Sequence, residues 1–152
     1  MNKKWDSRWM GLARYIAEWS GDPSTKVGAV IIDEENNVIS LGWNDMCRGV
    51  ADLPERRVRP DKYAWTPHAE ANAVYNTAGR SGAVGTCKIY CTLFPCNGCA
   101  QAIVQATGLK IVEIIAPECD LTDERYGWPI SVQIFKERGI KYRFYEEKEG
   151  SL

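Results

Sequence analysis

The sequence predicts a single α/β domain of three layers, in which a five-stranded mixed sheet carries helices on both faces. With 152 residues the chain has the length of one domain and can bury a substantial core. Strand-like and helix-like segments alternate through its second half, which is typical of parallel strands joined by right-handed helical crossovers. No internal repeat and no linker-like stretch divides the chain, so one domain is expected.

The first half of the chain predicts a helix followed by a hairpin. Apolar residues recur at helical spacing from Trp5 to Trp19, and a stretch containing Gly and Pro then ends the helix. The segments "KVGAVIID" and "NVISLGW" predict two strands joined by a polar turn. Residues 44–67 are polar, contain several prolines and show no period. Loops of this length in a compact domain are usually functional or disordered.

The second half predicts three further helices and three further strands. The helices are expected at about 68–78, 96–107 and 129–138, and the strands at 87–94, 109–115 and 140–146. The near-continuous apolar character of 109–115 predicts a strand covered on both faces. The acidic tail, about 146–152, is expected to fray.

Composition excludes several classes of function. The net charge of −1 provides no global attraction to nucleic acid or to anionic membranes. No stretch approaches the roughly 20 apolar residues of a membrane helix. The N-terminus lacks the apolar run of an export signal, so a cytoplasmic location is expected, or host cytoplasm for a viral protein. The 6 cysteines then indicate metal binding or buried thiols rather than disulfides.

The only histidine of the chain has candidate partners in a distant segment. His68 begins one predicted helix, and Cys96 and Cys99 lie three residues apart at the start of another. If the intervening strand makes these helices neighbours, the three side chains can bind one zinc ion. Three protein ligands leave the fourth tetrahedral position open, which distinguishes a catalytic site from a structural one.

Glu70 is the candidate catalytic residue. Two residues beyond His68 at a helix start, its carboxylate can reach a water on the metal without replacing it as a ligand. Zinc lowers the pKa of such a water to about 7. The combination His-x-Glu and Pro-Cys-x-x-Cys is the signature of the zinc deaminases, and this chain carries it as "HAE" and "PCNGC".

A closed structural site is the alternative interpretation of the cysteines. Cys87 and Cys91 could join Cys96 and Cys99 in a four-thiolate cluster that leaves His68 idle. However, Cys87 and Cys91 are four residues apart in a predicted strand and would share a face at some distance from the helix start.

From about Asp22 to Gly139 the chain resembles the deoxycytidylate deaminases, which have the cytidine deaminase fold. The resemblance is densest in "DPSTKVGAVII", "GWN", "HAEANA" and "TLFPCNGCAQAIVQATG". The "HAE" and "PCxxCA" motifs are shared with tRNA adenosine deaminases and nucleobase deaminases, so they indicate the chemistry and not the substrate. The "DPSTKVGA" run and the long loop favour the deoxycytidylate branch, whose reaction converts dCMP into dUMP and ammonia.

The resemblance also implies roles for individual residues. Zinc would be bound by His68, Cys96 and Cys99, and Glu70 would move protons between water, ring nitrogen 3 and the leaving amine. The residues implied in substrate binding are Ser24 and Lys26 for the 5′-phosphate, Asn44 for the sugar, and Ala69 and Tyr126. An Asn in a turn and a solvated Lys at a strand start are the ordinary alternatives for Asn44 and Lys26. In place of Tyr126, Arg125 could make the contact from the same loop.

One departure from the family bears on regulation. The family's motif has Gly where this chain has Asp45, in a loop that binds regulatory triphosphates in many relatives. A carboxylate would repel a triphosphate unless Mg²⁺ intervened. Weak or absent regulation is therefore expected.

Other functions stay open at this point. The loop is locally basic, as a polynucleotide deaminase would require, but the sequence pI of about 5.9 argues against nucleic acid as a partner. A free nucleoside or dCTP as substrate, and a non-catalytic zinc-stabilised binding module, are further alternatives. The resemblance implies a homo-oligomer, a hexamer or smaller.

Overall fold

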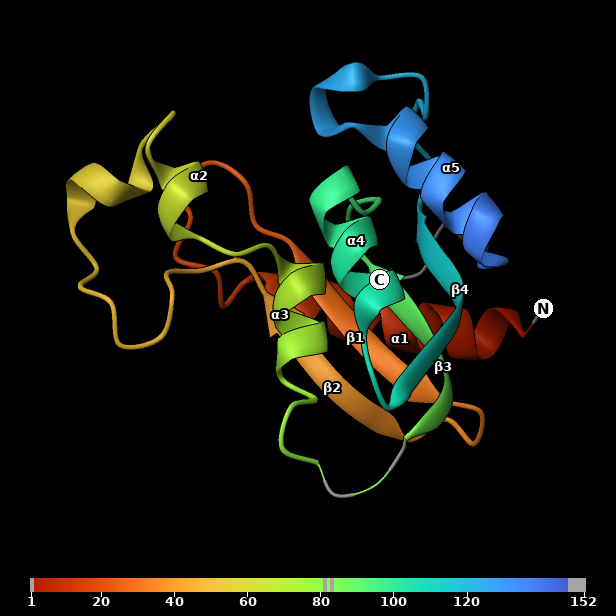
Figure 1. Cartoon of the computed structure of the whole chain (residues 1–152). Helices are drawn as coiled ribbons and strands as arrows, with labels where there is room; N and C mark the ends of the chain where they lie inside the picture. The colour runs from red at the N-terminus through yellow and green to blue at the C-terminus, as the bar shows by residue number, and fades with distance from the viewer. Residues whose placement is uncertain (1, 81, 83, 148–152) are drawn as a thin grey trace.

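The computed structural model describes residues 2–80, 82 and 84–147 (Figure 1). In chain order the elements are α1 (Lys3–Ala17), β1 (Gly28–Asp33), β2 (Val38–Trp43), the 3₁₀ helix η1 (Pro54–Arg57), α2 (Lys62–Trp65), α3 (Ala69–Tyr75), β3 (Gly85–Cys91), α4 (Asn97–Gln105), β4 (Leu109–Pro117), the 3₁₀ helix η2 (Glu124–Tyr126), α5 (Trp128–Arg138) and β5 (Lys141–Tyr145). Most of the tail that was expected to fray, residues 148–152, lies outside the described residues.

The sheet is five-stranded and mixed, as predicted. Its strand order is β2-β1-β3-β4-β5. β1 pairs antiparallel with both β2 and β3, whereas β3, β4 and β5 run parallel. The parallel part contains the alternating strands and helices of the second half of the sequence, in which α4 and α5 are the crossovers.

Helices cover both faces of the sheet, which confirms the three-layer prediction (Figure 1). α1 covers one face alone, where Met10, Ala13 and Ile16 pack against Val30 and Ile32 of β1. α3, α4 and α5 cover the other face. Because β1 lies in the middle of the sheet between two layers, nearly all of its side chains are buried.

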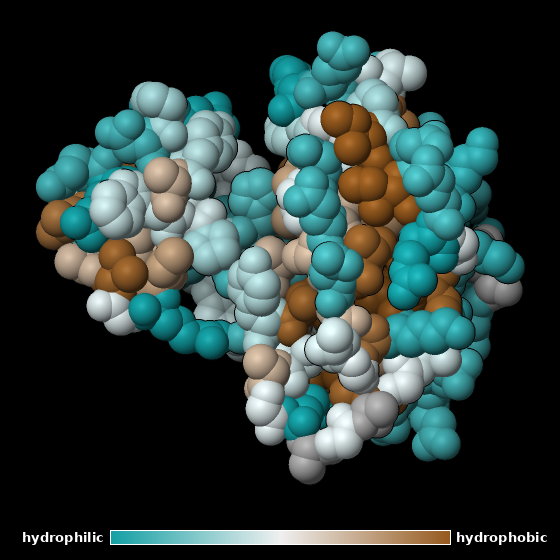
Figure 2. Space-filling model, in the orientation of Figure 1, coloured by the Kyte–Doolittle hydropathy of each residue, from teal (hydrophilic) through white to brown (hydrophobic). Residues whose placement is uncertain are grey.

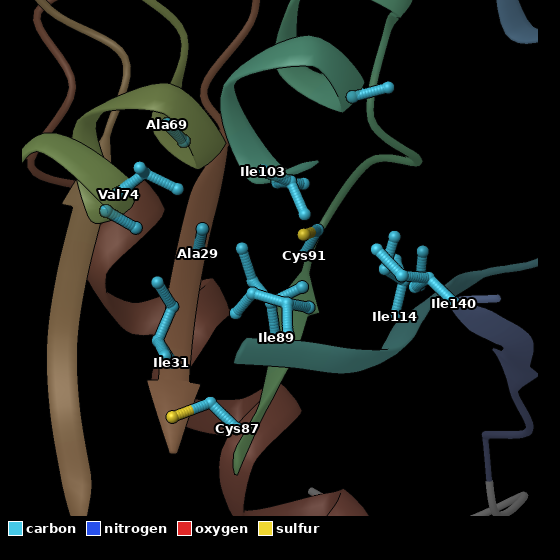
Figure 3. Packing of buried hydrophobic residues seen from close by; sticks show 14 of the residues in the cluster. Ala29, Ile31, Ala69, Val74, Cys87, Ile89, Cys91, Ile103, Ile114 and Ile140 are labelled. Carbon is cyan, nitrogen blue, oxygen red and sulfur yellow. The ribbon is translucent and has the colours of Figure 1, made fainter. Parts of the chain in front are cut away.

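The larger core lies between the sheet and the three helices (Figure 3). Ile31, Ile89 and Ile114 come from three neighbouring strands and are all at most 2 % exposed. Cys87 and Cys91 share this face of β3, since residues four apart in a strand point the same way. This core holds α3 and α4 side by side.

Gly42 sets the distance between α3 and β2. A Cβ atom at this position would collide with the carbonyl oxygen of Ala69 and the backbone nitrogen of Ala73. The absence of a side chain thus lets the first turn of α3 lie directly on the strand. The residues that begin α3 are thereby held close to the sheet.

Some element boundaries differ from the predictions. The strand expected at 87–94 ends at Cys91, because Thr92 bonds back to Gly28: its hydroxyl accepts from the Gly28 N–H and its own N–H donates to the Gly28 carbonyl. The chain can then turn toward Cys96. The loop predicted at 44–67 contains η1 and α2, both four residues long. Among the described helices, none combines the length and apolar character needed to cross a bilayer.

Candidate active site

The fold brings His68, Cys96 and Cys99 together at the N-terminal ends of α3 and α4. His68 is the N-cap residue of α3, Cys96 is the N-cap residue of α4, and Cys99 lies in its first turn. The Nδ1 atom of His68 lies 3.3 Å from the Cys96 sulfur and 3.5 Å from the Cys99 sulfur. Of all His, Cys, Asp and Glu side chains in the described part of the chain, only these form a group of three that could hold a metal ion.

The spacing of the three ligand atoms fits zinc. Tetrahedral zinc with Zn–S bonds of about 2.3 Å and Zn–N bonds of about 2.0–2.1 Å separates a sulfur and a nitrogen by about 3.6 Å. The three atoms lie within 4.8 Å of one another, and the ligands range from exposed His68 to buried Cys99. One side of the cluster is therefore open, as a fourth, exchangeable ligand requires.

The two thiols differ strongly in acidity. A hydrogen bond from Cys99 lowers the pKa of Cys96 to about 4, and the hydrogen bond with His68 acts in the same direction. The bond to Cys96 and burial together raise the pKa of Cys99. A metal ion binds thiolates, so its binding would displace the proton that remains on this pair.

Glu70 lies beside the cluster and is 3 % exposed. Its Oε2 accepts a hydrogen bond from the Cys99 thiol at 3.4 Å. Burial raises the pKa of this carboxyl group above its ordinary value. A carboxyl group near the cluster with a raised pKa is suited to taking up and returning a proton.

A cavity of about 440 Å³ opens next to these residues. His68, Glu70 and Cys96 line its floor, and apolar contacts come from Leu93 and Phe94. This volume and this mixture of apolar walls with a few polar groups are typical of a small-molecule site.

The structure brings only some of the expected substrate-binding residues to the cavity. Asn44 and Tyr126 line it, together with Arg125. Ser24, Lys26 and Ala69 are not among its lining residues. Lys26 is instead directed to Glu18, with 3.7 Å between the amine and the carboxylate, and Ala69 is fully buried in the core.

The Asn44 side chain bonds to the backbone of the segment that precedes β1, as an Asn with a structural role would. Its Oδ1 accepts from the backbone N–H of Val27 at 2.7 Å, and its Nδ2 donates to the carbonyl of Thr25 at 2.8 Å. These bonds fix the amide group at the cavity wall. A ligand can still use the second N–H and the remaining lone pairs.

Three cationic side chains reach the cavity, and the sequence analysis named only one of them, Arg125, as a possible substrate contact in place of Tyr126. They are Arg59, Lys62 and Arg125. Arg125 forms an ion pair with Asp123, and Lys62 forms one with Asp22. Arg59 forms no ion pair with any residue in the described ranges. The sequence offered one indication of such cations, the basic composition of the 44–67 loop. A basic composition is equally typical of a solvated loop.

Two further residues of this loop, Asp45 and Trp65, have side-chain partners within the loop. Asp45, expected to repel a triphosphate, forms an ion pair at 2.8 Å with Arg57, so its charge is locally balanced. In the same loop, the Arg56 guanidinium stacks 3.9 Å from the ring centre of Trp65.

The remaining cysteines are free thiols. Cys87 and Cys91 are buried in the core, and burial is the main cause that raises the pKa of both. Neither belongs to the described metal-ligand group, so the four-thiolate alternative is wrong for this structure.

Comparison with known proteins shows the family. The family described as "Cytidine and deoxycytidylate deaminase zinc-binding region" matches residues 3–115. Deoxycytidylate deaminase of Mus musculus is 36 % identical over an alignment of 155 positions, which covers 98 % of this chain and 84 % of that protein. The human deoxycytidylate deaminase is 35 % identical over 151 residues, or 95 % of this chain and 82 % of that protein. The chain belongs to the cytidine and deoxycytidylate deaminase zinc-binding family.

A solved structure shares the fold. The dCMP deaminase of cyanophage S-TIM5, in complex with dCMP and dUMP, superposes with a TM-score of 0.73 at 22 % identity. The superposition covers 95 % of this chain and 98 % of that chain.

Proposed function

We propose that this chain catalyses the hydrolytic deamination of dCMP to dUMP and ammonia, and that His68, Cys96 and Cys99 hold the zinc ion. Zinc bound there would make a water molecule nucleophilic at neutral pH. The observation that carries the proposal is the position of Glu70, buried beside the ligand cluster, with its Oε2 3.4 Å from the Cys99 sulfur. The relatives named deoxycytidylate deaminase support the choice of substrate.

Glu70 is the proton carrier in this proposal. It takes a proton from the attacking water and delivers it to ring nitrogen 3 of cytosine, while the water oxygen adds to ring carbon 4. Glu70 then takes the second proton from the new hydroxyl group on ring carbon 4 and passes it to the amine. The C–N bond breaks, ammonia leaves and carbon 4 keeps a carbonyl oxygen. Burial suits this role because it brings the pKa of a carboxyl group closer to neutral pH, where proton transfer in both directions is efficient.

Arg59 is the residue that we assign to the 5′-phosphate. It lines the cavity, lies in an exposed part of the loop and pairs with no acid among the described residues. A guanidinium group can bind phosphate through two parallel hydrogen bonds. Lys62 adds a second positive charge nearby, although Asp22 neutralises part of it. These residues replace Ser24 and Lys26, which the cavity does not include.

Asn44 and Tyr126 are proposed to contact the sugar and the base, respectively. Both line the cavity. The Tyr126 ring stacks on Trp128, with 4.7 Å between the ring centroids, which limits its freedom to move. A preorganised aromatic wall favours a flat pyrimidine ring.

The experiment that tests this function measures ammonia release from cytidine, deoxycytidine, dCMP and dCTP, with a tRNA stem-loop as control. Wild-type protein should prefer dCMP. Glu70→Gln should keep its zinc but lose about 10²–10⁴-fold in kcat, since general acid–base catalysis contributes that much. Arg59→Gln should raise KM for dCMP much more than for deoxycytidine. Full activity in Glu70→Gln would refute the catalytic assignment.

We also infer that the chain forms a homo-oligomer. A groove of about 890 Å³ runs along α3 and α4, where the small residues Gly98 and Ala102 of α4 line it. Figure 2 shows a strip of hydrophobic residues on the face that α4 and α5 form, and a groove there is lined by Val104, Leu109 and Ile140. Apolar surface of this kind often marks a protein interface. Light scattering after size-exclusion chromatography tests this, and a monomer at all concentrations would contradict it.

A further inference from the structure

The loop at residues 44–67 forms one wall of the cavity but contributes little to the core. Arg59, Lys62 and Tyr63 reach the cavity from this loop. None of the residues 45–61 is buried. The loop protrudes from the sheet at the left of Figure 1, and in Figure 2 its surface mixes hydrophilic residues with exposed apolar ones, so its apolar side chains are not packed into the core. Hydrophobic burial therefore cannot be what holds this wall in place, and polar contacts must do so.

Arg57 is the centre of these polar contacts. Its Nη2 donates to Asp45 at 2.8 Å, and its Nε and Nη2 both donate to Asp52. Asp45 lies two residues after the end of β2, so the guanidinium joins the start of the loop to its middle. The Arg57 side chain is only 17 % exposed, whereas Asp45 and Asp52 are 30 % and 52 % exposed, so the guanidinium group is enclosed by the loop and its acid partners stay in contact with solvent.

The same guanidinium rests on the turn that follows α1. A Cβ atom at Gly21 would lie 2.6 Å from Nη2 of Arg57, so any side chain there would require the guanidinium group to move. Ser20, in the same turn, donates its hydroxyl to the carbonyl of Asn44. The Oδ2 atom of Asp22 accepts a hydrogen bond from the Lys62 ammonium group at 2.8 Å. Two cations of the loop, Arg57 and Lys62, are thus seated on adjacent residues of one turn.

We propose that Arg57, held between Asp45 and Asp52 above Gly21, is a positioning residue that fixes the loop so that Arg59 faces the nucleotide. The proposal rests on the proposed deamination of a nucleotide at this site. Without Arg57 the loop would sample many conformations, and binding would have to select the one that presents Arg59. The zinc ligands and Glu70 lie on or next to α3 and α4, which the core holds independently. The effect should therefore fall on KM and not on kcat.

The first experiment compares Arg57→Gln with Arg56→Gln. Arg56 is the matched control, because it donates to the Ala51 carbonyl and stacks on Trp65 but forms no ion pair with an acid among the described residues. In Arg57→Gln we expect KM for dCMP to rise about tenfold with kcat within about twofold, the pattern of lost ground-state binding. Zinc content should equal that of wild type. Arg56→Gln should change KM by less than about twofold, since its contacts lie within the loop and not at its anchors.

A second variant displaces Arg57 without removing it. Gly21→Ala places a methyl group where the guanidinium lies, so it should raise KM in the same direction. Limited trypsin digestion then reports the loop itself: cleavage after Arg48 should be faster in Arg57→Gln and Gly21→Ala than in wild type.

Several results would contradict the positioning role of Arg57. Unchanged KM and unchanged cleavage in Arg57→Gln would overturn the proposal, and so would a fall in kcat with loss of zinc, which indicates general damage. An equal KM effect in Arg56→Gln would also overturn it. If wild-type protein does not deaminate dCMP, the proposed function fails, whereas the trypsin comparison still tests whether Arg57 holds the loop.

Discussion

The ammonium group of Lys62 lies 2.8 Å from the carboxylate of Asp22, and the two side chains are 4 % and 5 % exposed. Lys62 also donates to the hydroxyl of Ser24. The pair joins the loop to the turn after α1, next to the cavity. Its burial makes each partner dependent on the other, since an unpaired charge in such a place is strongly unfavourable.

Substitution of Lys62 by Met should therefore destabilise the protein by about 3–5 kcal/mol, the usual cost of leaving a buried charge without its partner. Urea unfolding monitored by tryptophan fluorescence measures this. Lys26→Met is the matched control, because its ion pair with Glu18 is largely exposed. That variant should change stability by at most about 1 kcal/mol. Similar losses in both variants would show that burial of the Lys62 pair is unimportant.

Asp22 should make stability depend on acid pH. Burial alone would raise its pKa, but the hydrogen bonds from Lys62, Ser24 and Thr25 outweigh burial and hold the pKa well below 3.8. A carboxyl group with a lowered folded-state pKa contributes stability above its unfolded pKa of about 3.9 and loses it as the pH falls through the folded value.

In wild type, the melting temperature should thus fall more steeply below about pH 4 than in Asp22→Asn, which has no proton to take up at this position. The two slopes should agree above about pH 6, where this carboxyl group no longer titrates in either state. Parallel curves over the whole acid range would contradict the role assigned to Asp22.

Removal of a proposed zinc ligand should abolish activity, whereas removal of a core cysteine should not. Cys99→Ala is expected to lose stoichiometric zinc and all measurable deamination, because two protein ligands bind zinc far more weakly than three. Cys91→Ala is the control, since Cys91 is equally buried but belongs to the core. It should keep its zinc, as measured by elemental analysis of freshly purified protein. Zinc retained in Cys99→Ala would refute the ligand assignment.

Gly42→Ala should damage the site from a distance. The new methyl group would collide with Ala69 and Ala73, so α3 must move away from β2 and carry Glu70 with it. We expect a loss of stability of about 1–3 kcal/mol, as for other overpacked cores, together with weaker zinc binding.

Gly11→Ala is the control for Gly42→Ala, because Gly11 lies in α1 with no atom near the added Cβ. It should stabilise the protein by about 0.5–1 kcal/mol through improved helix propensity. If Gly42→Ala also stabilises the protein, the position of α3 does not depend on its close approach to β2.

Much of the fold and of the site was predictable because it depends on local patterns. Hydrophobic period and turn residues predicted the five strands along the chain, and the alternation in the second half predicted the parallel strands β3, β4 and β5. His68, Cys96 and Cys99 were predictable as a group because chemistry demands those residue types at helix starts. The ends of elements were less predictable. β3 ends at Cys91 because the next residue, Thr92, accepts a hydrogen bond from Gly28, which is distant in the sequence.

The sequence by itself determined the three-layer α/β architecture and the candidate zinc site. The first follows from hydrophobic periods, and the second from two local motifs, His-x-Glu and Pro-Cys-x-x-Cys, each at a predicted helix start. Only the tertiary structure decided which basic residues face the cavity. Lys26, beside a strand, turns to Glu18, whereas Arg59 and Lys62 reach the cavity from a loop without any period. The physical reason is that this loop is placed by ion pairs such as Arg57 with Asp45 and Lys62 with Asp22, and the partners of an ion pair follow from the folded chain, not from their spacing in the sequence.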